Sequence, residues 1–96
     1  MHSNTSSEDF YSRFYDQLLE SQNWPGFYLF KFIVKSESPH LEELKSFFDP
    51  KEAVFSEKKS SKNTFTSLSI KIKMSKPEQV IDIYKKSSKL EGIISL

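Results

Sequence analysis

The segment from Phe65 to Met74 constrains the fold more than any other part of the chain, because its side chains alternate between apolar and polar. The apolar side carries Leu68, Ile70, Ile72 and Met74, and the polar side carries Ser67, Ser69, Lys71 and Lys73. This period of two predicts a β-strand with one face in the core and the other toward water or a separate cover. Such a strand needs neighbouring strands and a layer of helices on its apolar side.

A plan of strand, Ser and Pro, helix and strand occurs twice, over residues 28–59 and 64–96. In the first half, the β-rich segment 28–34 precedes Ser38 and Pro39, which suit the start of a helix, and a strand is expected at 53–59. In the second half, Pro77 opens a helix and Gly92 closes it before a short strand at 93–96. Asn63, in the loop between the halves, is the natural residue for a left-handed backbone conformation.

Two βαβ halves of this kind predict an α+β fold, namely a ferredoxin-like βαββαβ sandwich. We expect a four-stranded antiparallel sheet with both helices on one face, and with the strands 28–34 and 65–74 at its centre. The spacing of Phe10, Phe14 and Leu18 predicts an additional N-terminal helix that ends near Glu20. We therefore expect a flexible tail at residues 1–9 and one domain at residues 10–96.

The overall charge excludes a global field that would attract polyanions. The 14 Lys and Arg residues nearly balance the 13 Asp and Glu residues, which leaves a net charge of +1. There is no cysteine, and no apolar run approaches the ~20 residues that cross a bilayer. We expect a cytoplasmic protein that makes no membrane contact.

Residues for catalysis or metal binding are sparse. The only histidines are His2, in the expected tail, and His40, at the start of a helix. The loop from Ser36 to Pro39 lacks the thiolates of a soft-metal site, and the glycines, Gly26 and Gly92, form no phosphate loop. We therefore expect a non-enzymatic protein with no catalytic residue, no metal and no cofactor.

A local cluster of lysines and serines near the central hairpin has two interpretations. It protects a sheet edge from further pairing, or it contacts an anionic ligand or a partner. The candidate contact residues are Lys59, Ser60, Ser61, Lys62, Phe65, Ser67 and Lys71.

Binding of RNA to the sheet would need several exposed rings on the central strands. Phe65 is the only such ring that the alternation supplies, because the first strand offers Leu29, Lys31 and Ile33. The sequence therefore weighs against a nucleic-acid partner. Leu29, Ile33 and Phe65 also need shelter, either from the N-terminal helix or from a second copy that pairs through the sheet face or edge.

Several short segments, in this order, resemble the YbeD-like family of bacterial domains of unknown function. They are Trp24-Pro25, the strand 28–34, the loop Ser60-Ser61-Lys62 with its continuation to Ser67, and the segment 80–84. The resemblance covers residues 10–96 and implies a ferredoxin-like fold similar to ACT-type regulatory domains. It implies a small regulatory or protein-interaction module that senses a small molecule or a partner. A single-stranded nucleic-acid-binding domain is the alternative. Lys62 and Asn63 stand where the family commonly has a glycine.

Overall fold

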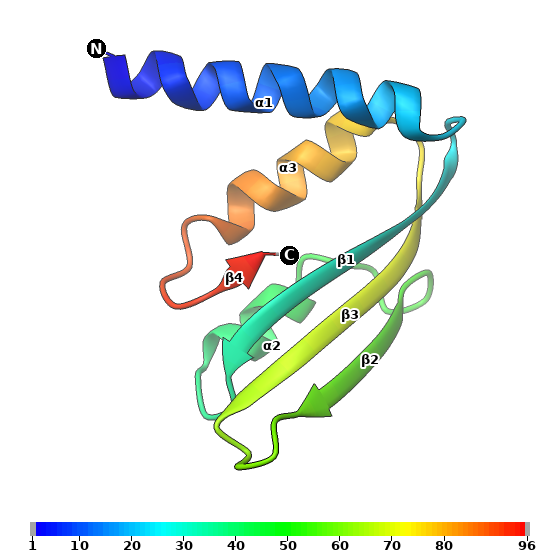
Figure 1. Ribbon diagram of the computed structural model, residues 1–96. Coiled ribbons are helices and arrows are strands. Elements are labelled where there is room, and N and C mark those ends of the chain that lie inside the picture. The colour runs from blue at the N-terminus through cyan, green and yellow to red at the C-terminus, as the bar shows by residue number, and fades with distance from the viewer. Residues whose placement is uncertain (1, 96) are drawn as a thin grey trace.

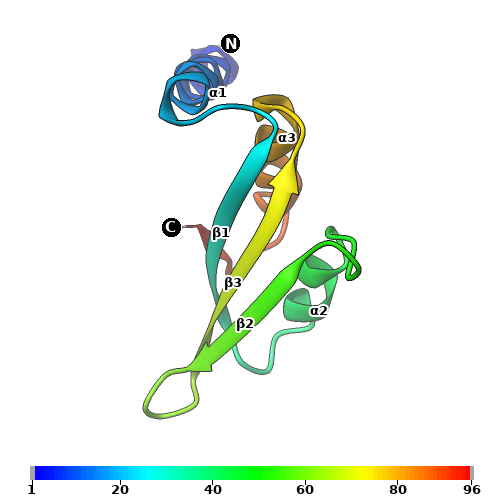
Figure 2. The same ribbon diagram turned by 90° about the vertical axis from the view of Figure 1, so that its right-hand side faces the viewer.

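The computed structural model describes residues 2–95, with side-chain positions from residue 8 onward, and it confirms the α+β architecture. The elements follow one another as α1 (His2–Ser21), β1 (Gly26–Lys35), α2 (His40–Lys45), β2 (Val54–Lys59), β3 (Phe65–Met74), α3 (Pro77–Ser87) and β4 (Ile94–Ser95). The four strands form one antiparallel sheet in the order β2-β3-β1-β4, with β1 and β3 in the centre as expected. Figures 1 and 2 show α2 and α3 on the same side of this sheet.

The core lies between the sheet and these two helices. In β3, Leu68, Ile70, Ile72 and Met74 are all buried, which confirms the side that the alternation predicts. From β1, Phe30 and Phe32 are fully buried, and their rings lie stacked with centroids 6.2 Å apart. The rings of Phe30 and Phe48 meet edge to face at 5.2 Å. Large rings therefore supply much of the core, as the aromatic content of the chain requires.

The N-terminal helix begins at His2, within the segment that the sequence analysis assigns to a tail; Met1 lies outside the described residues. The inward face of α1 consists of Tyr11, Phe14, Tyr15 and the buried Leu18. Phe10, expected on that face, is 57% exposed. The helix runs beside α3, where the ring centroids of Phe14 and Tyr84 lie 5.4 Å apart. None of the described helices covers the face of the sheet that lies away from α2 and α3 (Figure 2).

Two turns follow local chemistry. Asn63 has a φ of 57°, so it takes the left-handed conformation that the sequence analysis expects of it. Gly26 follows a cis Trp24–Pro25 peptide bond. A Cβ atom at position 26 would lie 2.6 Å from the carbonyl oxygen of Asn23, so this close approach requires glycine.

The helix α2 ends at Lys45, after six residues. The hydroxyl of Ser46 donates a hydrogen bond to the carbonyl oxygen of Glu43, which occupies a backbone acceptor at the helix end. The following turn still brings Phe48 into the core. Ile94–Ser95 form β4, and Leu96, expected in the same strand, lies outside the described residues.

Candidate anion-binding face

The side of the sheet away from α2 and α3 carries every second residue of its strands. These residues are Phe27, Leu29, Lys31, Ile33 and Lys35 from β1, Val54, Ser56 and Lys58 from β2, Phe65, Ser67, Ser69, Lys71 and Lys73 from β3, and Ile94 from β4. Every charged residue in this set is a lysine. We call the set the basic face.

The strand register spaces these lysines along the sheet. Lys71 lies between Val54 and Leu29 in one row across the strands, and Ser69 lies between Ser56 and Lys31 in the next. Beyond the Lys71 row, Lys73 lies opposite Phe27. Beyond the Ser69 row, Lys58 lies opposite Ser67 and then Lys35 opposite Phe65, so each of the five rows holds one lysine. Because consecutive rows are two residues apart, they are separated by about 6.6 Å, and the whole track is ~26 Å long.

A hollow of about 300 Å³ lies at the centre of the basic face. It is lined by Lys31, Phe32, Ser56, Lys58, Ser67, Leu68 and Ser69. The hydroxyls of its three serines form no hydrogen bond with any described residue, and its two lysines form no ion pair with one. Ammonium and hydroxyl donors therefore converge on a space in which an anionic group can accept from both.

Two exposed rings lie at opposite ends of this track. Phe27 is 59% exposed and Phe65 is 41% exposed. The ammonium nitrogen of Lys71 lies 5.3 Å from the ring centroid of Phe27, so one face of that ring attracts a cation while the rest is open. The basic face thus combines cations, hydroxyls and apolar surface, which also includes the exposed Leu29, Val54 and Ile94, and none of the described helices covers it.

The structure separates the contact residues that the sequence analysis groups together. Phe65, Ser67 and Lys71 lie on the basic face, whereas Lys59 lies opposite the buried Thr66 and therefore points to the helix side. Ser60, Ser61 and Lys62 form the loop at the end of the hairpin. The hydroxyl of Ser60 accepts hydrogen bonds from the amides of Thr64 and Phe65, so it holds the loop together.

Eleven of the fourteen residues of the basic face are absent from that group, among them Phe27, Lys31, Ser56, Lys58 and Ser69. Phe27 is missed because β1 begins at Gly26, before the β-rich segment that marks it in the sequence. Lys31 is recognised in the sequence as the polar interruption of this strand. Its approach to Ser56 and Ser69 depends on the register between three strands, which no local pattern specifies.

The acidic side chains lie elsewhere. Glu57 of β2 is the acidic residue within β1, β2 and β3. It lies opposite Leu68 on the helix side of the sheet and forms an ion pair with Lys45 of α2. The hydrogen bond from Lys45 to Glu57 raises the pKa of Lys45, against the opposing effect of its partial burial. A hollow of about 610 Å³ near the two helices is lined by Asp49, Glu52 and Asp82 together with Lys73 and Lys86, among other residues. The acids therefore all lie off the basic face, whereas basic residues occur on both sides of the sheet.

A third hollow, of about 320 Å³, lies between α1, β1, α3 and β4. It is lined by Phe10, Tyr11, Phe14, Tyr28, Tyr84, Ser88 and Ser95. The phenol oxygens of Tyr28 and Tyr84 are 3.2 Å apart and share a hydrogen bond. Burial, followed by this hydrogen bond, raises the pKa of Tyr84. The hollow is aromatic and neutral, in contrast to the basic face.

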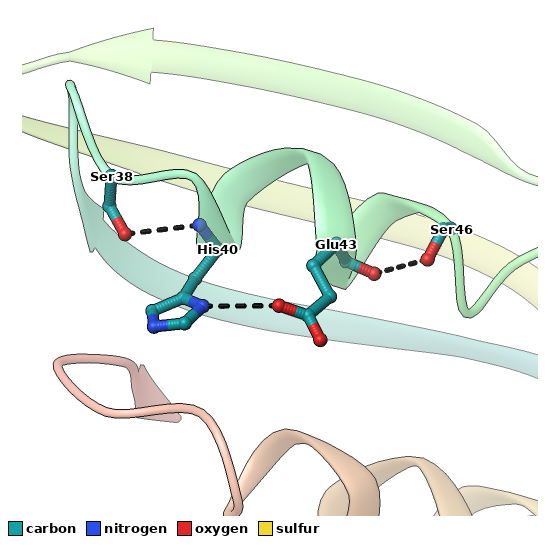
Figure 3. A network of polar contacts seen from close by, with 4 residues as sticks. All are labelled: Ser38, His40, Glu43 and Ser46. Atoms are coloured by element: carbon teal, nitrogen blue, oxygen red, sulfur yellow. Dashed lines mark hydrogen bonds and ion pairs between the residues drawn. The ribbon is translucent and has the colours of Figure 1, made fainter.

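Figure 3 shows the polar contacts within α2 and at its two ends. The Nδ1 atom of His40 and the Oε1 atom of Glu43 are 3.2 Å apart at the protein surface. The nearby hydroxyl of Ser38 accepts a hydrogen bond from the backbone amide of His40, and that of Ser46 donates to a backbone carbonyl. Both hydroxyls therefore serve the backbone of this helix.

Within residues 2–95, no three His, Asp or Glu side chains gather as a metal site would require. None of the described helices has the length and apolarity needed to traverse a bilayer.

The fold and the basic face define a small ferredoxin-like α+β domain with one open, cationic side of its sheet. The chain belongs to the DUF493 family of proteins of unknown function, whose family model matches residues 20–96. This family is the YbeD-like family, so the resemblance drawn from short segments is confirmed. The match begins at Glu20, near the end of α1. Neither the curated proteins nor the solved structures contain a significant match.

Proposed function

We propose that this protein is a non-enzymatic, ACT-like regulatory or interaction module that binds an anionic ligand or partner through its basic face. The observation that carries the proposal is the sorting of charge. Every acidic residue of the chain lies in a helix, in a loop or, in the case of Glu57, on the helix side of β2. A protein with a net charge of +1 therefore presents one face of uniform positive sign.

The hollow at the centre of the basic face supports binding rather than edge protection alone. Lysines that only prevent strand pairing belong on an edge strand, whereas Lys31 and Lys71 lie on the two central strands. A charged residue at a central position of an uncovered sheet face adds little to folding. The lysines of the hollow, together with its serine hydroxyls that have no partner among the described residues, are the donors that an anion site needs.

The test is retention on immobilised heparin as a sulfated polyanionic probe. The variant Lys31→Glu/Lys58→Glu reverses both lysines of the central hollow. The variant Lys51→Glu/Lys89→Glu changes the net charge equally at exposed positions outside the basic face. We expect the wild-type protein and the second variant to be retained at low salt, and the first variant to pass through. Equal elution of the two variants would show that the position of the lysines is irrelevant and would refute the proposal.

A further inference from the structure

We infer that the anionic partner of the basic face is a single-stranded nucleic acid, whose phosphates contact the lysine and serine track while Phe27 and Phe65 stack on bases. This inference rests on the proposed function and specifies its ligand. Three features carry it: the composition of the face, the spacing of its cations and the position of its rings.

The composition of the basic face favours phosphates over protein carboxylates. Interfaces between proteins are depleted in Lys and Ser at their centres and enriched in Arg, Met and the aromatic residues. The centre of this face contains Lys31 and Lys58 with three serines, and its two phenylalanines lie at the ends of the track and not at the centre. Lysine and serine are common donors to phosphate oxygens, and paired recognition of carboxylates prefers the planar fork of arginine.

The spacing of the lysines fits a linear polyanion. One lysine occurs in each successive row, about every 6.6 Å along a track of ~26 Å. A nucleic-acid strand in a helix has one phosphate per ~3.4 Å, so the track covers about eight nucleotides at most, and fewer in a strand drawn out for stacking. A compact anion would use only the central hollow and would leave the lysines at the ends without a role.

The rings favour a single strand over a duplex. Phe27 and Phe65 are both more than two-fifths exposed, so their faces are accessible to unpaired bases. Bases within a duplex stack on each other, and their faces are closed to side chains. Stacking on protein rings together with a positively charged groove is the usual mode of single-strand binding.

The same charge pattern disfavours a second copy as the occupant of this face. Two basic faces in contact would bring Lys31, Lys58 and Lys71 of both copies together, with no acid on either side to neutralise them. Like charges at close range repel, and this repulsion is strongest where water is excluded.

The experiment measures fluorescence anisotropy of end-labelled 12-nucleotide oligouridylate and oligothymidylate with the full chain at several salt concentrations. We expect binding of the wild-type protein to weaken as salt rises. The loss of two phosphate contacts in Lys31→Glu/Lys58→Glu should reduce the slope of log affinity against log salt by about 1.4. Lys51→Glu/Lys89→Glu should keep the wild-type slope. Phe65→Leu, which keeps an apolar side chain but removes the ring, should weaken binding roughly 5- to 100-fold.

The outcomes separate this inference from the proposed function. The single-strand assignment is overturned, and the proposed function stands, if heparin retention depends on Lys31 and Lys58 while the oligonucleotides do not bind. A duplex or polyglutamate that binds as tightly as the single strand at equal salt also overturns the assignment, as does a Phe65→Leu variant with unchanged affinity. If neither heparin nor oligonucleotide distinguishes the two charge-reversed variants, both the inference and the proposed function fail.

Discussion

Truncation of Phe30 should be far more costly than truncation of Phe27, although the two phenylalanines lie in the same strand. Phe30 is completely buried, and its ring centroid lies 4.7 Å from that of Tyr28, 5.2 Å from that of Phe48 and 5.4 Å from that of Tyr84. Replacing such a residue by alanine removes its burial and leaves a cavity, which costs about 3–5 kcal/mol. The lost ring–ring contacts place Phe30→Ala toward the upper end of this range.

This loss is large against the whole stability of a chain of 96 residues, which is ~5–14 kcal/mol. Phe27→Ala removes a ring that is 59% exposed and one cation–π contact with Lys71, so it should cost about 1 kcal/mol or less. Urea unfolding followed by the fluorescence of Trp24 measures both values. Phe30→Leu, which leaves a smaller cavity, provides an intermediate variant if Phe30→Ala does not fold.

The comparison of the two variants tests which side of the sheet forms the core. Equal losses, or a larger loss for Phe27→Ala, would mean that the helices cover the other side. The basic face would then be buried, and the proposals that depend on its exposure would be refuted.

Three further predictions concern single contacts. Thr66→Val should lower the free energy of unfolding, measured in urea, by ~1–3 kcal/mol, because it deprives the hydroxyl of Ser36 of its partner at 2.9 Å. The additional change Ser36→Ala should restore part of this stability. Strictly additive losses in the two single variants would contradict a hydrogen bond between these hydroxyls. Tyr84 keeps its proton to a higher pH in the folded state, so the folded state binds more protons than the unfolded state above pH 10.0. The free energy of unfolding should therefore fall as pH rises from there, and Tyr84→Phe should make this fall shallower. An unchanged slope in the variant would contradict the raised pKa of Tyr84. Asn63→Gly should leave the melting temperature nearly unchanged, whereas Asn63→Val should lower it, because a branched side chain is strained at a φ of 57°. Equal melting temperatures for the two variants would exclude backbone strain at this turn.

The sequence predicts the parts of the fold that local chemistry determines. The alternation from Phe65 to Met74 identifies both the strand and its buried side, and the tolerance of Asn for a left-handed backbone identifies the turn at Asn63. The exposed position of Phe10 is not predicted, because the inward face of α1 depends on its packing against α3. A spacing of four residues drifts around the helix axis by about 40° per step, so Phe10 and Leu18 point in directions about 80° apart.

The candidate site is less predictable for a related reason. Lys58 and Lys59 are neighbours in sequence, yet the register places one on the basic face and the other on the helix side. A count of charges along the chain cannot distinguish them, and the net charge of +1 conceals that one face of the sheet carries lysines and no acid. The position of a charge relative to the sheet is set by contacts between distant segments.

The basic face carries five lysines and no acid, and this uneven charge distribution gives the molecule an electric dipole. The basic face is positive, and the remainder of the chain is net negative because all the acids lie there. In dilute salt, neighbouring molecules should attract each other in a head-to-tail orientation, and added salt should weaken that attraction by shortening the Debye length. Near pH 7.9, the isoelectric point expected from its composition, net repulsion vanishes, and the protein should therefore dissolve better in moderate salt than in water.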